Sequence, residues 1–101
     1  MTVAAISHHF SDGLYAKQML LAKGHLATSH KHNYSHLSIL AKGEVHIRVD
    51  GVVSHHVAPA CIEIVADAEH EILALQDVVW YCVHATNETD INNIDEMLIK
   101  E

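Results

Sequence analysis

Three histidines lie close together between two glycines, in the stretch that runs from Gly24 to Gly43. His30 and His32 are two residues apart, so on a β-strand their imidazoles point to the same face, roughly 7 Å from each other. One metal ion can bridge two such side chains. Turn-forming Asn-Tyr-Ser follows, and His36 then begins a second alternating segment. If that segment folds back on the first, His36 lies beside the pair and the three histidines share a metal site.

Two other interpretations of these histidines are open. His32 and His36 are four residues apart, which places them on one face of a helix, another ligand spacing. That interpretation leaves His30 off the face and requires a helix through Asn-Tyr-Ser. Alternatively, the three are ordinary surface histidines in a chain that has 11 of them. The strand interpretation is favoured because it uses all three residues.

The same stretch resembles the first motif of the cupin family, in which a glycine, five residues, His-x-His, three or four residues, a glutamate, six residues and a glycine follow one another. Gly24, His30, His32, His36 and Gly43 stand at these spacings, with a histidine in place of the usual glutamate. The resemblance implies a neutral ligand where most cupins have a charged one. A divalent ion would then keep its full charge, which favours anionic chelating substrates such as enolates and oxo-acids.

The second cupin motif usually ends in a histidine, and here VADAEH keeps that residue as His70, 34 residues after His36. The resemblance implies that His30, His32, His36 and His70 hold one divalent transition-metal ion: Mn, Fe, Ni, Co, Cu or Zn. Some small single-domain cupins carry four histidines at this spacing, bind manganese or related divalent ions, and show oxygen-dependent chemistry. The resemblance extends over residues 12–86, which is most of the chain.

The strongest strand pattern, VVWYCVHA, places Trp80, Cys82 and His84 on one face. If this is the inner face, as the resemblance to four-histidine cupins supports, the three side chains line a pocket around the metal. His84 is then a candidate general acid or base, and Tyr34 a second candidate at the mouth. The alternatives are a hydrogen-bonded wall histidine without a chemical role for His84, and plain core packing for Trp80 and Cys82.

The rest of the chain reads as short strands bounded by turns. Residues 44–50 alternate cleanly, and Asp50-Gly51 is typical of a two-residue hairpin turn. Residues 14–22 suit either a helix or a strand, and the barrel hypothesis makes them a strand. We therefore expect an all-β protein, a cupin-type antiparallel β-barrel (double-stranded β-helix or jelly roll). Apolar residues at helical spacing after Asp90 predict a short C-terminal helix or arm.

A length of 101 residues suits one domain, with a barrel at about 12–86 and a tail at 87–101. No apolar run approaches the ~20 residues of a membrane span, and the first residues lack the features of a secretory signal, so we expect a cytoplasmic protein. A net charge of −7 argues against binding to nucleic acids or anionic membranes. Cys61 and Cys82 fit neither a disulfide framework nor a zinc motif, which predicts two buried free thiols. A barrel this small often covers its edges in a homodimer.

Three functions agree with these patterns. The first is a metal-dependent oxidoreductase, dioxygenase-like, that acts on a small enolisable or unsaturated compound. The second is a metal-dependent isomerase or lyase that acts on a sugar-derived acid, and dependence on oxygen separates it from the first. The third is a non-catalytic module that binds a metal or a small ligand, which a pocket blocked by Trp80 would favour. The fold alone does not decide among them.

Overall fold

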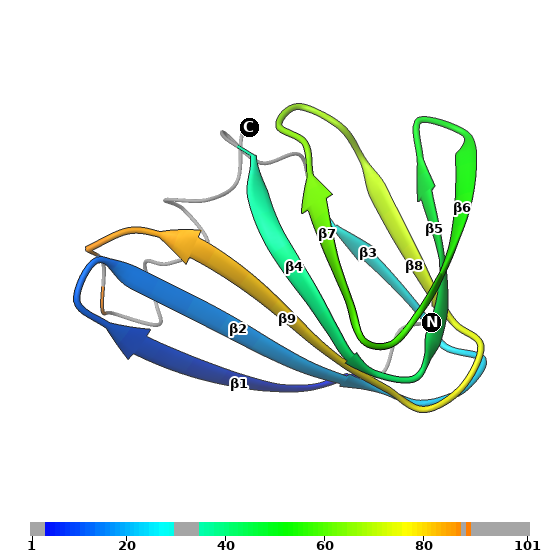
Figure 1. Cartoon of the computed structure of the whole chain (residues 1–101), viewed down its shortest axis with the longest axis horizontal. Coiled ribbons are helices and arrows are strands. Elements are labelled where there is room, and N and C mark those ends of the chain that lie inside the picture. The colour runs from blue at the N-terminus through cyan, green and yellow to red at the C-terminus, as the bar shows by residue number, and fades with distance from the viewer. Residues whose placement is uncertain (1–3, 30–34, 88, 90–101) are drawn as a thin grey trace.

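The computed structural model describes residues 4–29, 35–87 and 89. These residues form two antiparallel sheets that face each other, with strand orders β1-β2-β9-β4-β7 and β3-β8-β5-β6 (Figure 1). The strands are β1 Ala4–Ser11, β2 Leu14–Leu21, β3 Leu26–Ser29, β4 His36–Lys42, β5 Glu44–Val49, β6 Val52–Val57, β7 Ala60–Ile64, β8 His70–Ala74 and β9 Val78–Ala85. The predicted all-β class is confirmed, and the described residues form no helix.

The local turn chemistry explains two of the hairpins. Asp50 and Gly51 both have positive φ, 48° and 84°, as a two-residue turn with the twist of the flanking strands requires. They join β5 to β6 as predicted. Gly13, with φ of 73°, lies in the turn that joins β1 to β2. Residues 14–22, which the sequence allowed to be either a helix or a strand, contain the strand β2.

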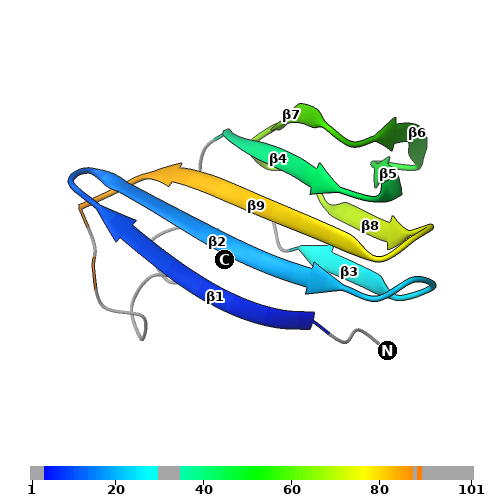
Figure 2. The ribbon, with the colours of Figure 1, turned by 60° about the horizontal axis from the view of Figure 1, so that its bottom comes forward.

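The chain changes sheet at its other short connections, and this closes the barrel. Gly43, with φ of 98°, separates β4 of the five-stranded sheet from β5 of the four-stranded sheet. Figure 2 shows the β1–β2 hairpin projecting beyond the four-stranded sheet. Ile6 of β1 is 47% exposed. The protein buries its core between the two sheets, where alternate residues of each strand point inward.

The core is formed by apolar side chains from both sheets. Its buried members are Leu21, Ala27, Leu40, Val45, Ile47, Ile64, Ile72, Ala74, Val78 and Trp80. The inner face of β8 carries the predicted set of His70, Ile72 and Ala74, all buried. Among the described residues, no helix is long and apolar enough to cross a membrane.

The structure corrects two of the sequence-based expectations and excludes one of the alternatives. The segments before and after residues 30–34 do not fold back on each other as a pair, because β3 pairs with β8 and β4 pairs with β9 and β7. His36 begins a strand, which excludes the helical interpretation of its spacing. Cys61 is exposed and not buried, since it lies on the outer face of β7 opposite Ile39. The predicted C-terminal helix lies outside the described residues.

Candidate functional site

The strands β4 and β8 begin, and β9 ends, at one end of the barrel, which we call the histidine end. His36 is the first residue of β4, His70 the first residue of β8, and His84 the last but one of β9. His36 pairs with Ile64 of β7, and the loop that follows Ile64 leads directly to His70. Figure 1 shows the starts of β4 and β8 at the same end of the two sheets. Three histidines that are far apart in the sequence therefore lie at one end of the molecule.

His70 is buried without a hydrogen-bond partner. It is 2% exposed, and neither of its ring nitrogens has a partner in the described part of the chain. The backbone of Ala68 lies near the ring but does not meet the geometry of a hydrogen bond. A buried polar atom left unsatisfied costs about 1–3 kcal/mol, so an unpartnered buried imidazole is the kind of group that a bound ligand completes.

The protonation state of His70 follows from its burial. Desolvation lowers the pKa of His70 below the ordinary histidine value of 6.5, because a buried imidazolium loses its hydration. The backbone of Ala68 and the negative charge of Asp50 raise the pKa, and they offset burial only in part. His70 is therefore neutral at pH 7, which is the form of imidazole that binds a metal ion.

His36 and His84 form a buried pair of imidazoles. His36 is 7% exposed and His84 is 2% exposed, and their ring centroids are 4.1 Å apart. The structure thus brings the predicted metal ligand His36 into contact with the predicted acid or base His84.

A small polar network lies beneath this pair. Ser38 Oγ is 3.5 Å from Nε2 of His36 and donates a hydrogen bond to Sγ of Cys82 at 3.7 Å. Trp80 Nε1 donates to the same sulfur at 3.3 Å. Burial raises the pKa of the Cys82 thiol, while the two hydrogen bonds and the charge of Lys17 act in the opposite direction. Cys82 therefore serves here as a neutral acceptor, and Trp80, 1% exposed, packs into the core.

Tyr15 is a residue of this end that the sequence interpretation missed. It is fully buried on β2, pairs with His84 of β9, and stacks on the His84 ring with the centroids 5.9 Å apart. Its Oη lies 2.7 Å from Nδ1 of His8 on β1. The sequence did contain an indication, because Tyr15, Met19 and Leu21 lie on the same face of a strand. This indication can be recognised only if the segment is known to be a strand.

The other predicted site residues, His30, His32 and Tyr34, lie outside the described residues. Ser29, the last residue of β3, pairs with His70. The segment that contains His30 and His32 therefore begins next to one predicted ligand, His70, and ends at another, His36. Among the side chains that the structure describes, no group of three His, Cys, Asp or Glu residues could by itself hold a metal ion.

Two of the described residues, His36 and His70, carry donors of the type that a divalent transition-metal ion accepts. His70 offers a neutral, buried nitrogen without a partner, and His36 begins the strand that leaves the same segment. Imidazole is a ligand that Zn, Cu, Fe and Ni accept, whereas Ca and Mg prefer oxygen. These two residues alone would not complete the coordination of such an ion.

The architecture is similar to that of several solved structures. A protein from Photorhabdus luminescens has a TM-score of 0.74 at 18% sequence identity, over 96% of this chain and 90% of its own. An RmlC-like cupin family protein with a double-stranded β-helix fold, from Methanocaldococcus jannaschii, has a TM-score of 0.71 at 13% identity, over 86% of this chain and 84% of its own. This chain has the cupin fold. The jelly-roll architecture expected from the sequence is thereby confirmed.

A third similar solved structure is much larger than this chain. Salicylate 1,2-dioxygenase from Pseudoaminobacter salicylatoxidans, solved with gentisate, has a TM-score of 0.76 at 10% identity, over 94% of this chain but only 27% of its own. No protein-family model matches the sequence, and a search of curated proteins finds no match. The comparisons therefore establish the fold of this cupin barrel.

Proposed function

We propose that this cupin binds one divalent transition-metal ion at the histidine end, through His30, His32, His36 and His70. We propose further that it is a metal-dependent oxidoreductase for a small enolisable or unsaturated compound. The observation that carries the proposal is the state of His70, which is buried and neutral and has no hydrogen-bond partner in the described part of the chain. A purely structural histidine at this depth is normally hydrogen-bonded.

The four imidazoles would leave about two positions open on an octahedral ion. A bound ion of this kind supplies Lewis acidity and, for redox-active metals, access to oxygen chemistry. Because all four ligands are neutral, the full positive charge of the ion is available to an anionic chelating substrate. The oxidoreductase proposal rests on this open, positively charged site, and a dioxygenase is among the solved proteins that share the fold.

His84 is the residue to which we assign proton transfer. Its ring lies against His36, the centroids being 4.1 Å apart, so it stands next to a ligand without being one of the four. Burial keeps bulk water away from it, and the stacked Tyr15 ring fixes its orientation from the other side. Tyr34 is the second acid–base candidate. Trp80 and Cys82 form the floor of the site, with Trp80 excluding water.

The burial of Trp80 favours a second candidate function. Trp80 is 1% exposed and belongs to the hydrophobic core, so its indole fills space below the site that a larger substrate would need. A non-catalytic module that binds a metal or a small ligand agrees with this packing. The measurement of oxygen uptake described below separates it from the oxidoreductase.

The first experiment measures metal content in protein purified without an affinity tag. We expect about one divalent transition-metal ion per chain by elemental analysis, because four imidazoles converge on one site. His70→Ala should lose most of this metal. The matched control is His46→Ala on the outer face of β5, which should retain it. A parent protein that holds no ion even after incubation with Mn²⁺, Fe²⁺ or Zn²⁺ would refute the metal site.

A second experiment compares two substitutions at His36. His36→Glu restores the usual cupin ligand, so metal binding should persist, but the negative carboxylate lowers the net charge of the site. His36→Ala leaves three ligands and should lower metal affinity by on the order of 10- to 100-fold or more. Equal metal content in the parent and in His36→Ala would show that His36 is not a ligand.

Oxygen uptake tests the oxidative reaction itself. With a 1,3-dicarbonyl or an electron-rich alkene as the probe, we expect uptake by the parent, altered uptake by His36→Glu, and background uptake by His70→Ala. His84→Gln should slow turnover by roughly 100-fold or more while leaving metal content unchanged, as expected for a general acid or base. If the metal-loaded parent takes up no oxygen with any probe, the isomerase, lyase and binding functions take precedence.

A further inference from the structure

Four rings form a row across the five-stranded sheet, in which β1, β2, β9 and β4 are successive neighbours (Figure 2). The ring centroids of His8 on β1 and Tyr15 on β2 are 5.8 Å apart, and the two rings are stacked. Tyr15 is stacked in turn on His84 of β9, at 5.9 Å. The row ends at His36 of β4, 4.1 Å from His84. It therefore connects a predicted metal ligand with the edge strand of the sheet.

The outer end of this row is a phenol in hydrogen-bond contact with an imidazole. Tyr15 is fully buried, whereas His8 is partly exposed. The distance between Oη of Tyr15 and Nδ1 of His8 is 2.7 Å. When His8 carries its proton on Nε2, the phenol donates its O–H to Nδ1, which is then an unprotonated basic nitrogen. A buried phenol thus touches a base that is accessible to solvent.

This arrangement suits the loss of one electron from Tyr15. A phenol that loses an electron becomes a strong acid, and a buried cation without a partner is costly. The electron and the proton of a buried tyrosine must therefore leave together, and the proton needs a base in contact. Stacked rings pass electrons without a hydrogen bond between them. The His84 ring lies against Tyr15 on the inner side, for the electron, and His8 lies on the outer side, for the proton.

Two other oxidisable side chains of the described site lack such a base. Trp80 donates its Nε1–H to Sγ of Cys82 at 3.3 Å, and a neutral thiol is a poor acceptor for the proton that an oxidised indole releases. Cys82 has Ser38 and Trp80 as its hydrogen-bond partners, and neither of them is a base. In the described part of the site, Tyr15 is therefore the one of these three side chains that can lose an electron and a proton together.

We propose that Tyr15 and His8 form a one-electron redox pair through which oxidising equivalents leave the histidine end. The Tyr15 ring gives one electron to a one-electron oxidant, the O–H bond of Tyr15 breaks, and an N–H bond forms at Nδ1 of His8. The products are a neutral phenoxyl radical, an imidazolium ion and the reduced oxidant. The proposal rests on the oxidoreductase function proposed above, since the oxidant in that function is an oxidised metal ion at the histidine end.

The reverse step restores the pair. A small one-electron reductant in solution, such as ascorbate, gives an electron to the phenoxyl radical of Tyr15, and His8 returns the proton to the phenol oxygen. The partial exposure of His8 places this end of the row within reach of solution. An oxidising equivalent that no substrate consumes is thereby led away from Trp80 and Cys82 and discharged at the edge of the sheet.

The first measurement uses the metal-free full-length protein and a photogenerated ruthenium(III) tris-bipyridine complex as the one-electron oxidant, so its result does not depend on the metal site. The chain has three tyrosines, and Tyr34→Phe with Tyr81→Phe leaves Tyr15 as the only one. We call this variant the single-tyrosine protein. We expect the transient absorption and the EPR spectrum of a neutral phenoxyl radical, and Tyr15→Phe in the same protein should abolish both.

The test variant is His8→Gln in the single-tyrosine protein. The glutamine amide can accept a hydrogen bond from the phenol but is not a base, so a merely structural role of His8 would survive the change. We expect the radical to form about 100-fold more slowly, the lower end of the effect of a positioned acid or base. The matched control is His9→Gln, the neighbouring residue, which contacts Gln18 at 3.1 Å and should leave the rate unchanged.

Deuterium oxide provides a test that needs no substitution at His8. Because the proton moves with the electron, the radical should form more slowly in deuterium oxide than in water. Equal rates in the two solvents would show that no proton moves with the electron, and would overturn the redox pair even if His8→Gln did not fold.

The second measurement tests the connection with the histidine end. The single-tyrosine protein is loaded with Fe²⁺ and mixed with hydrogen peroxide. Reduction of the peroxide to two water molecules takes two protons from solvent and two electrons, one from Fe²⁺ and one from Tyr15, whose own proton passes to His8. We expect the same phenoxyl EPR signal. His84→Leu interrupts the row of rings and should lower the yield of this radical at equal iron content.

The outcomes separate the redox pair from the metal site. If the ruthenium complex oxidises Tyr15 equally fast with and without His8, or places the radical on Trp80, the pair is refuted and the metal site stands. If iron-loaded protein gives no radical, or His84→Leu gives the full yield, the connection with the histidine end is refuted. Protein that binds no Fe²⁺ refutes the proposed function and this connection together, while the ruthenium measurement still decides whether Tyr15 and His8 act as a redox pair.

Discussion

His70 couples the stability of the metal-free protein to pH. Its folded pKa is lowered by burial, so between that value and the ordinary value of 6.5 the unfolded chain binds a proton that the folded protein does not. The contribution of His70 to stability is complete above pH 6.5 and is lost as the pH falls below it. We expect the free energy of unfolding, measured by urea titration, to fall by up to about 1.4 kcal/mol per pH unit through this residue.

The variant His70→Leu isolates this contribution. It removes the titrating group and fills the site with an apolar side chain, so stability should depend less on pH below 6.5. His9→Gln, an exposed position on β1, is the control and should behave like the parent. Parallel pH profiles for the parent and His70→Leu would show that the burial of this imidazole has no consequence for folding.

The two cysteines should differ in reactivity. Cys61 is exposed on β7, whereas the thiol of Cys82 accepts hydrogen bonds from Ser38 and Trp80 and has a pKa raised by burial. Since the thiolate is the reactive form, Cys82 should react with an aromatic disulfide reagent at least on the order of tenfold more slowly than Cys61. Titration of the native protein should give one fast thiol and the unfolded protein two. Two fast thiols in the native protein would contradict this.

Local pattern could identify the site residues that lie on regular strands. The alternation of Trp80, Cys82 and His84 placed them together on a face that is indeed the inner one. The Tyr15–His8 contact could not be found in this way, because it depends on the pairing of β1 with β2 and on which face of that hairpin turns inward. Cys61 was expected to be buried because cysteine usually is, and its place on an outer face overrides that preference.

At the scale of the elements, the turn between β4 and β5 depends on Gly43. Its φ is 98°, and a Cβ added there would lie 2.4 Å from the carbonyl oxygen of Asp77 and 2.9 Å from Cγ2 of Val78. Gly24 also has positive φ, 86°, but a Cβ there would meet nothing within 4 Å. The two positions therefore share backbone strain and differ in steric contact.

We expect Gly24→Ala to cost about 1 kcal/mol of stability through backbone strain alone. Gly43→Ala should cost roughly 1–3 kcal/mol more, because the added methyl group displaces the backbone at Asp77. Thermal unfolding of both variants measures the difference. Equal melting temperatures would indicate that the Asp77 backbone relaxes without cost and that the close approach at Gly43 has little structural importance.

The strands themselves could be predicted from local pattern better than their partners could. The turn at Asp50-Gly51 fixes the β5–β6 hairpin from two residues. By contrast, β3 and β4 are neighbours in sequence and lie in different sheets. Their separation is set by the pairing of β3 with β8 and of β4 with β9. The first residue pairs of these ladders, Leu26 with Leu73 and Leu37 with Val83, are more than 40 residues apart in the sequence, and no local spacing encodes such pairs. His36 and His70 thus come to one end through the topology of the whole barrel.

At the scale of the whole molecule, the outer face of the five-stranded sheet is apolar. Leu37 and Ile39 of β4 are 53% and 41% exposed, and they pair with Val83 and Tyr81 of β9 on the same face. Leu20 of β2 extends this row and is 43% exposed. We call this surface, made of the outward side chains of β2, β9 and β4, the outer apolar face. Its strands span an area of about 15 Å by 26 Å, before the relief of the side chains is counted.

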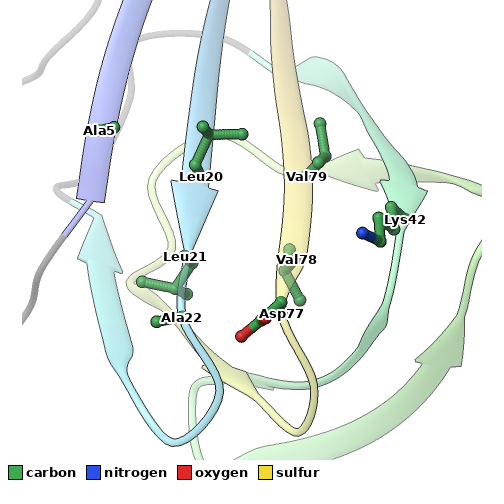
Figure 3. Close-up of a pocket in the computed structure, with 8 residues that line it drawn as sticks. All are labelled: Ala5, Leu20, Leu21, Ala22, Lys42, Asp77, Val78 and Val79. Atoms are coloured by element: carbon green, nitrogen blue, oxygen red, sulfur yellow. The ribbon is translucent and has the colours of Figure 1, made fainter.

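A hollow continues the outer apolar face toward the β8–β9 turn. Figure 3 shows Leu20 and Val79 side by side on neighbouring strands, with Lys42 on β4 on the other side of β9 and Asp77 next to Val78; all four residues line the hollow. A second copy related by a two-fold axis would present the same apolar surface and the same two opposite charges. The chain therefore carries, on one face, both parts of a self-complementary contact, an apolar centre and a charged rim.

We expect the protein to be a homodimer through the outer apolar face. Because a net charge of −7 on each chain opposes association, the dimer should become tighter as salt screens that repulsion. Leu37→Glu places one carboxylate from each subunit in the contact and should weaken the dimer by at least about 2 kcal/mol, or roughly 30-fold in Kd. Sedimentation velocity across a range of protein concentrations measures both effects.

Val52→Glu is the matched control, since it adds the same charge at a valine that is 71% exposed on β6, in the other sheet. It should leave the dimer intact. A reversed result, with dissociation by Val52→Glu and none by Leu37→Glu, would place the contact at β6. Val53 and Val57 of this strand are also more than half exposed. Among the described residues, β6 pairs only with β5, so its other edge is open. A parent that sediments as a monomer at high concentration and high salt would show that the outer apolar face does not bind a second copy.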